Sequence, residues 1–350
     1  MNDDAGIALA LSEALKAVGR THPNPAVGAV VVKAGKIVST GFTSPAGGPH
    51  AEAIALERAG KRAKGATLYV SLEPCAHHGR TPPCTDAIIK AGIKRVVFSV
   101  KDPNPKVNGK GAKKLRAAGL EVVQGVRAHD AEKLNRPFFK FMREGLPWVT
   151  LKAGVTLDGK LATSTGKSKW ITSEASRGVA HELRDSIDAI VVGAGTVEAD
   201  DPALTTRLKG GRNAVRVVLD AALRTKAERQ VFDTKVARTI LVTPHLASRH
   251  AARGVEVWNV TGTEALLRKL AAEGLLHVLV EGGAFTHAEF LKAGLFDELV
   301  LFVAPKLFGH DGLTWSGLLG VKDPAAAIEL EHLHAELVGE DLMLTATRKR

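Results

Sequence analysis

The chain has 350 residues, of which 45% are hydrophobic and 24% charged, and its formal net charge is +11. This length exceeds what one hydrophobic core usually serves, so we expect two domains. Two cysteines exclude a small secreted fold built on a disulfide framework. Asp3 and Asp4 stand where a signal peptide carries basic residues, and no apolar run approaches the length of a membrane span. We therefore expect a cytoplasmic protein with no membrane partner.

The first part of the chain alternates between helical and extended patterns. Asp3 or Asp4 is expected to cap a first helix, in which Ile7, Leu11 and Leu15 share one face. Strands at 26–32 and 37–42 are predicted to form a hairpin, and the Pro- and Gly-rich stretch 73–83 a loop. The other predicted elements are helices at 50–59, 85–91, 111–118 and 129–142, and strands at 67–72, 95–100 and 120–126. This alternation predicts an α/β sandwich whose later strands are parallel.

A boundary is predicted at 143–148, where Gly145 and Pro147 separate two patterned regions. We expect one domain over residues 1–145 and a second over 146–350. The second again alternates between the two patterns, with strands at 148–153, 189–193, 215–220, 239–243, 277–281 and 298–304 and helices at 173–186, 264–273 and 285–293. It is therefore predicted to be α/β as well.

The positive charge is concentrated in the first of these domains. Residues up to Glu144 hold 23 Lys and Arg against 12 Asp and Glu, a net of +11, whereas the remainder holds 25 of each. A basic half is typical of proteins that bind nucleic acid or phosphorylated substrates. Charge alone, however, favours a solvated lysine-rich surface.

One group of residues in the first domain has the chemistry of a catalytic zinc site. His50 opens a predicted helix, Cys75 follows a strand, and Cys84 lies nine positions later. One imidazole and two thiolates suit tetrahedral zinc and leave a fourth position open for water, as catalytic sites do. Glu52, two residues after His50, can reach that position without being a ligand, and it is the expected proton carrier. The arrangement resembles the signature of zinc nucleobase deaminases, from which it departs by eight residues between the cysteines instead of two.

A purely structural zinc site is the alternative interpretation. His77 or His78 could then supply a fourth protein ligand. That interpretation gives Glu52 no role, so we favour the deaminase interpretation.

Longer motifs resemble one family. They are Thr21-His-Pro-Asn-Pro-Ala-Val-Gly28, Pro49-His-Ala-Glu52, Glu73-Pro-Cys-Ala-His-His-Gly-Arg-Thr-Pro-Pro-Cys84 and Asp102-Pro-Asn-Pro105. The chain is similar there to the bifunctional deaminase/reductases of riboflavin biosynthesis. The resemblance implies a cytidine-deaminase-like fold and hydrolytic removal of the C2 amine from a phosphoribosylated diaminopyrimidinone. It further implies one Zn²⁺ per chain and substrate contacts from Asn24, His77, Arg80, Asp102 and Asn104.

Thr43 departs from the pattern of that family. Many members carry His at this position, after Gly and an aromatic residue, and Thr43 follows Gly41-Phe42 here. The substrate contact that the family's His would make is therefore not expected from this chain.

Two glycine clusters follow strands in the second domain, Val192-Gly-Ala-Gly-Thr196 and Val280-Glu-Gly-Gly-Ala284. Glycines at a strand end allow backbone N–H groups to approach a phosphate, although tight turns have the same pattern. Neither cluster is a Rossmann fingerprint, because the third glycine position after Gly193 and Gly195 holds Glu198. Arg184 and Arg207 could each bind a phosphate.

The second domain also resembles the riboflavin-biosynthesis family, in its reductase half. The matching runs are 151–160, 168–171, 199–205 and 304–307, and Thr156 stands where Ser is common. The resemblance implies a dihydrofolate-reductase-like fold and NADPH as the cofactor. By position, the implied cofactor contacts are Gly154, Trp170, Thr196, Asp200, Gly283 and Ala284. The implied substrate contacts are Lys152, Ser168, Arg184, Leu204, Arg207 and Glu281.

The expected function is a two-step enzyme acting on a phosphorylated pyrimidine. Hydride transfer to C1′ of the ribosylamino group needs a proton, for which Lys152, Asp158 and Glu281 are candidates. A nucleic-acid or free-base deaminase and an RNA-binding zinc module are the alternatives. Aromatic residues make up only 5% of the chain, with one Tyr, so stacking on nucleic acid is not expected. We expect a homo-oligomer that binds no nucleic acid.

Overall fold

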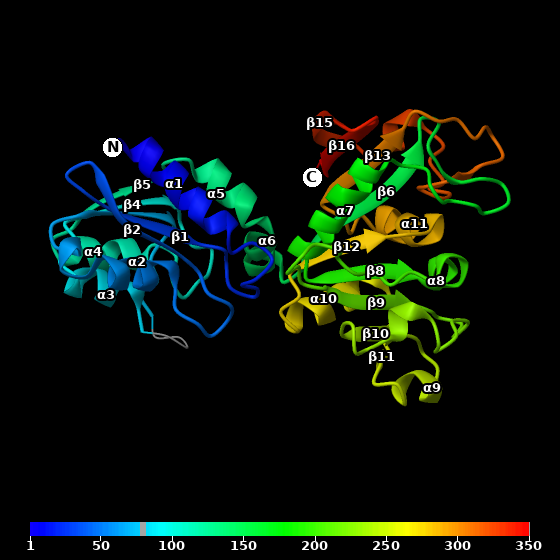
Figure 1. Cartoon of the computed structure of the whole chain (residues 1–350), viewed down its shortest axis with the longest axis horizontal. Helices are drawn as coiled ribbons and strands as arrows, with labels where there is room; N and C mark the ends of the chain where they lie inside the picture. The colour runs from blue at the N-terminus through cyan, green and yellow to red at the C-terminus, as the bar shows by residue number, and fades with distance from the viewer. Residues whose placement is uncertain (78–81, 350) are drawn as a thin grey trace. The chain divides into compact units, whose positions relative to one another are not determined.

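The computed structural model describes residues 1–77 and 82–349. The chain divides into two compact units, residues 1–145 and 146–350 (Figure 1). Each unit combines helices with a mixed β-sheet, which confirms the predicted α/β class.

One mixed sheet organises the described part of the first unit, in the strand order β2-β1-β3-β4-β5. The hairpin strand β1 is antiparallel to both of its neighbours, whereas β3, β4 and β5 are parallel, as predicted for the later strands. The strands are β1 (Gly28–Lys33), β2 (Lys36–Phe42), β3 (Thr67–Leu72), β4 (Arg95–Val100) and β5 (Glu121–Gln124).

Helices cover both faces of this sheet. Ile7 and Ala131 place α1 and α5 against one face, whereas Ala55, Ile88 and Leu115 place α2, α3 and α4 against the other (Figure 1). The helices are α1 (Asp3–Leu15), α2 (Ala51–Ala59), α3 (Cys84–Lys90), α4 (Lys110–Ala117), α5 (Ala128–Leu134) and α6 (Arg136–Glu144), with a 3₁₀ turn η1 (Gly60–Ala63).

Two details of the first unit differ from the prediction. The cap of α1 is Asn2, whose side chain accepts from the Ala5 N–H at 2.9 Å, so the predicted caps Asp3 and Asp4 lie inside the first turn. The single helix expected at 129–142 is two helices that meet at Asn135. Pro137 causes part of this break, because proline has no N–H to continue the hydrogen bonding of α5.

The second unit is built on a longer mixed sheet, in the order β11-β10-β9-β8-β12-β6-β13-β16-β15. The strands from β11 to β13 are parallel, and β16 and β15 add antiparallel pairs at one edge. The strands are β6 (Trp148–Thr156), β8 (Ala189–Gly193), β9 (Val215–Leu219), β10 (Thr239–Val242), β11 (Glu256–Trp258), β12 (His277–Glu281), β13 (Glu298–Ala304), β15 (Leu330–Val338) and β16 (Asp341–Arg348). A small separate sheet pairs β7 (Lys160–Ala162) with β14 (Leu313–Thr314).

The helices of this unit follow its parallel strands. Leu267 of α10 and Phe290 of α11 pack in a core with Val191 and Val217, whereas Val197 of α8 packs with Val192 and Val218 on the other face. The helices are α7 (Glu174–Ser186), α8 (Ala194–Asp200), α9 (Ser248–Ala251), α10 (Thr263–Ala272) and α11 (Ala284–Ala293), with 3₁₀ turns η2 (Gln230–Phe232) and η3 (Pro324–Ala326). The short elements β7, α8, α9, β11 and β14 and the pair β15–β16 were not predicted. In β15 nearly every residue is exposed, so the strand leaves little hydrophobic pattern.

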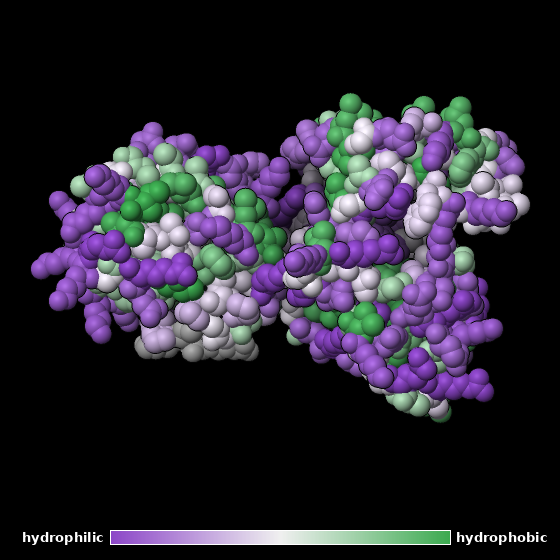
Figure 2. Space-filling view, viewed as in Figure 1, coloured by the Kyte–Doolittle hydropathy of each residue, from purple (hydrophilic) through white to green (hydrophobic). Residues whose placement is uncertain are grey.

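The surface carries no extended apolar face in the view of Figure 2, where hydrophobic side chains are scattered among hydrophilic ones. Across residues 1–77 and 82–349, the helices lack the combination of length and apolar character needed to cross a lipid bilayer.

Candidate active sites

The side chains of His50, Cys75 and Cys84 come together in the first unit. Their ligand atoms all lie within 4.8 Å of one another. His50 is the N-cap residue of α2, Cys75 follows β3, and Cys84 begins α3. The Nδ1 atom of His50 is 3.2 Å from Sγ of Cys84 and 3.7 Å from Sγ of Cys75. Tetrahedral zinc requires about 3.5 Å between such nitrogen and sulfur ligands, so the three residues fit the ion.

The hydrogen bonds of this cluster favour a thiolate at Cys75. Hydrogen bonding from Cys84, and to a lesser extent from His50, lowers the pKa of Cys75 against the opposing effect of burial. The Cys84 N–H also donates to the Cys75 sulfur at 3.3 Å. Because zinc binds the thiolate rather than the thiol, Cys75 is prepared for a metal ligand's role.

Glu52 lies in the first turn of α2 and is 4% exposed. Its burial, and next the negative charge of Cys75, raise the pKa of Glu52 to about 7. A carboxyl group whose pKa is close to the working pH can both accept and donate a proton.

Asp102 belongs to the same electrostatic cluster. It is buried, and this burial, together with the charges of Glu73 and Cys75, raises the pKa of Asp102 to about 6, against the opposing effects of the hydrogen bond from the Asn104 N–H and, more weakly, of His50. Its Oδ1 accepts from the Asn104 N–H at 2.8 Å, so the position of Asn104 depends directly on Asp102.

Two of the other residues expected at the substrate site, Asn24 and His77, lie in loops. Asn24 is half-buried in a turn in which its N–H donates to the Thr21 carbonyl at 2.9 Å. In the described residues, Nδ1 of half-buried His77 has no hydrogen-bond partner. Arg80 and His78 lie outside the described residues.

Thr43 has a structural role at the end of β2. Its hydroxyl accepts from the Val27 N–H at 3.1 Å and donates to the Val27 carbonyl at 3.3 Å. Thr43 therefore ties the end of β2 to the start of β1.

In the second unit, the two glycine clusters meet. A Cβ atom on Gly282 would lie 2.8 Å from Oγ1 of Thr196, and one on Gly193 would lie 2.4 Å from Oγ1 of Thr286. The turn at Gly282 and Gly283, both with positive φ, leads into α11, which begins at Ala284. Backbone N–H groups at the start of a helix suit a phosphate, so Thr196, Gly283 and Ala284 fit a dinucleotide's pyrophosphate.

Ser168, Trp170 and Asp200 lie near one another beside α8. The Ser168 hydroxyl donates to Oδ1 of Asp200 at 3.3 Å, and Lys169 pairs with the same oxygen at 3.9 Å. Trp170 is 63% exposed. The guanidinium carbon of Arg177 lies over its ring, 4.5 Å from the ring centroid. On β6, Gly154 stands so close to Thr172 that a Cβ atom would lie 3.1 Å from its methyl group.

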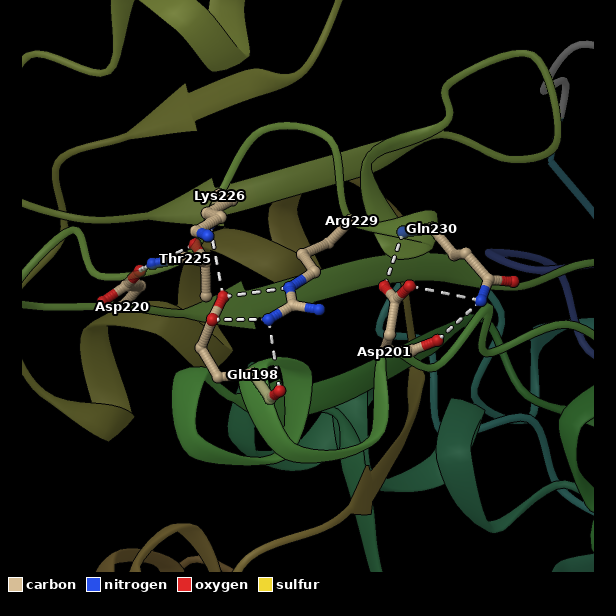
Figure 3. A network of polar contacts seen from close by, with 7 residues as sticks. All are labelled: Glu198, Asp201, Asp220, Thr225, Lys226, Arg229 and Gln230. Atoms are coloured by element: carbon tan, nitrogen blue, oxygen red, sulfur yellow. Dashed lines mark hydrogen bonds and ion pairs between the residues drawn. The ribbon is translucent and has the colours of Figure 1, made fainter.

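Figure 3 shows what holds α8 in place. Glu198 pairs with Arg229 at 2.7 Å and accepts from the Lys226 N–H at 3.2 Å, while Asp201 accepts from the Gln230 N–H at 2.9 Å. The segment 226–230 thereby fixes the helix that carries Thr196 and Asp200. Glu198, which stands where a Rossmann fingerprint has its third glycine, therefore has a structural role in holding α8.

A buried charged cluster ends β12. Glu281 pairs with Lys152 at 3.3 Å through one carboxylate oxygen and accepts hydrogen bonds from Arg184 at the other. Burial opposes ionisation, but the charges of Arg184 and Lys152 outweigh it and lower the pKa of Glu281 to about 2. Arg184 also donates to the Thr205 carbonyl at 3.3 Å, beside buried Leu204.

Arg184 and exposed Arg207 act on a common neighbour, His181. Burial first, and then the charges of these two arginines, lower the pKa of His181. The charges of Arg184 and Arg207 therefore both reach His181.

Comparison with known proteins identifies both units. Residues 147–344 match the model of the RibD C-terminal domain, and residues 1–100 match that of the cytidine and deoxycytidylate deaminase zinc-binding region. The riboflavin biosynthesis protein RibD of Aquifex aeolicus is 50% identical over 342 residues, 96% of each chain. The chain belongs to the RibD family. Its RibD relative from Escherichia coli K12 is 40% identical, covering 98% of this chain and 99% of the relative.

Solved RibD structures have the same fold over almost the whole chain. RibD of Acinetobacter baumannii superposes with a TM-score of 0.93 at 36% identity, covering 99% of both chains. A diaminohydroxyphosphoribosylaminopyrimidine deaminase/5-amino-6-(5-phosphoribosylamino)uracil reductase from Thermotoga maritima gives 0.91 at 41% identity, with the same coverage. The chain is thus a bifunctional deaminase and reductase of riboflavin biosynthesis with a zinc-binding deaminase region, which confirms the resemblance found in the sequence.

Two structurally important residues, Glu73 and Arg216, were not predicted from the sequence. Glu73 lies within a motif but was assigned nothing, although a carboxylate directly after a buried strand is an available signal. Arg216, the second residue of the otherwise apolar strand β9, is completely buried. Its donors reach backbone carbonyls whose proximity no local pattern reveals.

Proposed function

We propose that the first unit removes the C2 amine of 2,5-diamino-6-(5-phosphoribosylamino)pyrimidin-4-one, and that the second reduces the ribosyl side chain to ribityl with NADPH. The observation that carries the first half is the convergence of His50, Cys75 and Cys84 beside buried Glu52. The relative from Thermotoga maritima is a diaminohydroxyphosphoribosylaminopyrimidine deaminase and 5-amino-6-(5-phosphoribosylamino)uracil reductase, which supports both halves of the proposal.

In the deamination, one water replaces one amine at C2. Zinc, when held by the three ligands, supplies the Lewis acidity that lowers the pKa of a water molecule toward 7. Glu52 takes a proton from the water and delivers it to the departing nitrogen, so that a C–O bond forms, the C–N bond breaks and ammonia leaves. Asn24, His77, Arg80, Asp102 and Asn104 bind the pyrimidine and its ribose phosphate.

In the reduction, NADPH, when bound, supplies a hydride to C1′; the C1′–O4′ bond of the ribose breaks, and the ring oxygen takes up a proton as a hydroxyl group. Thr196, Gly283 and Ala284 receive its phosphates, and Gly154, Trp170 and Asp200 complete the cofactor site. The substrate is held by Ser168, Arg184, Leu204 and Arg207. This assignment is supported by the meeting of the two glycine clusters.

Lys152 is the proposed proton donor of the reduction, among the three candidates. The low pKa of Glu281 leaves this carboxyl group without a proton at neutral pH. Asp158 is occupied by the Thr156 hydroxyl and by the N–H groups of Phe308 and Gly309. The side-chain nitrogen of Lys152 is a hydrogen-bond donor, and Glu281 holds this side chain in one direction at 3.3 Å.

The products of the diaminopyrimidine phosphate, followed by mass spectrometry, test the whole proposal. Without NADPH we expect a gain of about 1 Da, the exchange of NH for O. With NADPH we expect a further gain of about 2 Da, the hydride and the proton. Unchanged substrate mass with zinc-loaded protein would contradict the deaminase assignment, and a product that stops at the first step would contradict the reductase assignment.

Two further expectations belong to this proposal. We expect a homo-oligomer, which is supported by the exposed Leu333 and Leu337 on the edge strand β15, and a monomer by light scattering would contradict it. We expect the chain in the cytoplasm, because its phosphorylated substrates do not cross membranes unaided. Cell fractionation tests that location.

A further inference from the structure

Glu73 is a buried carboxylate between the last residue of β3 and the metal ligand Cys75. It is 3% exposed, and its two oxygens accept three backbone N–H groups from one distant segment. Oε2 accepts from Gly109 at 2.8 Å and from Asp102 at 3.4 Å, and Oε1 accepts from Ala112 at 3.1 Å. The two residues bound by Oε2 are the two ends of the segment 102–109.

Among the described residues, the other hydrogen bonds of that segment are local, and buried Val107 packs it into the unit. Within it, Asp102 accepts from the Asn104 N–H, and Asn104 accepts in turn from the Lys106 N–H at 3.0 Å. These turns are local, so they set the shape of the segment but not its place relative to the zinc ligands. The bonds to Glu73 connect it to the strand that leads to Cys75.

The start of α4 is also fitted to Glu73. The N-cap residue of α4 is Gly109, which has no side chain with which to cap the helix; Glu73 caps it instead, because its Oε1 accepts from the Ala112 N–H in the first turn. A Cβ atom on Gly111 would lie 2.0 Å from the Pro74 carbonyl oxygen. The first turn of α4 therefore lies directly against the 73–75 segment, and a glycine is required at this contact.

We propose that Glu73 is a positioning residue for deamination, which sets Asp102 and Asn104 at the correct distance from the zinc ligands. This inference rests on the proposed function, in which those two residues bind the substrate. One carboxylate joins the metal-binding segment to the substrate-binding segment, so the pyrimidine is held in register with the reacting centre. A shift of the 102–109 segment weakens substrate binding and leaves the zinc ligands in place.

Variants of the full zinc-loaded chain test this role. Glu73→Ala removes all three bonds, and we expect the KM of deamination to rise about tenfold or more, with a smaller change in kcat. Asn104→Ala should show the same kinetic pattern, because it removes one of the contacts that Glu73 positions. Zinc should remain at one ion per chain, and NADPH-dependent reduction of the deaminated substrate should be unchanged.

Two more variants separate positioning from simple stability. Glu73→Gln keeps the shape of the side chain and one acceptor oxygen, so its KM should lie between those of the wild type and Glu73→Ala. If Glu73→Ala does not fold, the KM of Glu73→Gln alone tests the positioning role. Ile7→Ala is the matched control, because Ile7 is completely buried on the opposite face of the same sheet. It should lower the melting temperature without changing the KM.

Backbone hydrogen exchange of residues 101–113 provides a direct readout of the segment. Exchange should be faster in Glu73→Ala and unchanged in Ile7→Ala. An unchanged KM in both Glu73 variants, loss of zinc, or an equal rise of KM in Ile7→Ala would overturn the positioning role alone. A wild-type protein that releases no ammonia would instead overturn the proposed function, and the positioning role with it.

Discussion

Lys152 and Glu281 lie directly opposite each other on the parallel strands β6 and β12, with Nζ of Lys152 3.3 Å from Oε1 of Glu281. Arg184 reaches the other oxygen of the same carboxylate from α7. A buried charge is stable only when it is paired, so these three side chains depend on one another.

Replacement of Glu281 should make the stability of the second unit less dependent on pH. The pKa of Glu281 is lowered from 4.5 to about 2, so its stabilising effect is complete above about pH 5 and is lost as the pH falls from 4.5 toward 2. At pH 7, Glu281→Gln should be less stable by on the order of 3 kcal/mol. All four tryptophans lie in this unit, so their fluorescence during urea unfolding measures it selectively. A difference between the two proteins that stays constant down to pH 3 would contradict this pKa.

Glu52→Gln should abolish deamination while zinc stays bound. The amide keeps the size of the carboxyl group but cannot carry a proton, which costs a factor of about 10² to 10⁴ in rate. Ammonia release and metal content are the two measurements. Deamination at the wild-type rate would refute the role of Glu52, whereas loss of zinc would show that the variant disturbs the ligands themselves.

Removal of zinc should separate the two activities. A chelator, or Cys75→Ser, takes away the ion or a thiolate ligand of the first unit, so ammonia release should stop. Oxidation of NADPH by substrate that has already been deaminated should continue, because the residues proposed for reduction all lie in the second unit. Readdition of Zn²⁺ should restore deamination in the chelated wild type. If chelation stopped both activities equally, the assignment of zinc to deamination alone would be wrong.

Gly282→Ala should weaken NADPH binding. Its φ is +127°, and the added methyl group would lie 2.8 Å from Oγ1 of Thr196, so the turn before α11 must move. We expect the dissociation constant of NADPH to rise by about tenfold or more, measured by fluorescence titration. Gly262→Ala is the matched control, since φ there is +89° but no atom lies within 4 Å of the added carbon. Equal effects of the two variants would indicate backbone strain rather than a lost cofactor site.

Arg216→Met should strongly destabilise the second unit. The Arg216 side chain donates to the Thr239 hydroxyl and to the carbonyls of Ala203, Asp233 and Ala237, among others, and it is completely buried. Methionine removes all of these donated hydrogen bonds at a buried position, at a cost of about 3 kcal/mol or more in the free energy of unfolding. Arg238→Ala, which removes an exposed arginine pairing with Glu256 and Glu273, should cost less than about 1 kcal/mol. Tryptophan fluorescence during urea unfolding compares them, and similar losses would contradict the assigned importance of the buried bonds.

The sequence by itself determined the α/β class, most helices and strands, and the candidate zinc ligands. Strands such as 67–72 and 95–100 are short, mostly apolar runs, and hydrophobic patterning of this kind is local. The zinc site of His50, Cys75 and Cys84 could be predicted because these residue types occur at characteristic spacings. Elements with weak patterns were missed, as the exposed strand β15 illustrates.

Only the tertiary structure decided how distant residues are paired. Glu73 meets Asp102 and Gly109 because β3 and β4 are neighbours, and Thr196 meets Gly282 because β8 and β12 are neighbours. Asn135 bridges the N–H and carbonyl of Ala26, which contributes to ending α5 where the local pattern continued. A hydrogen bond or a close approach between residues far apart in the chain depends on strand order and register, and these are set by the packing of the whole unit rather than by local sequence.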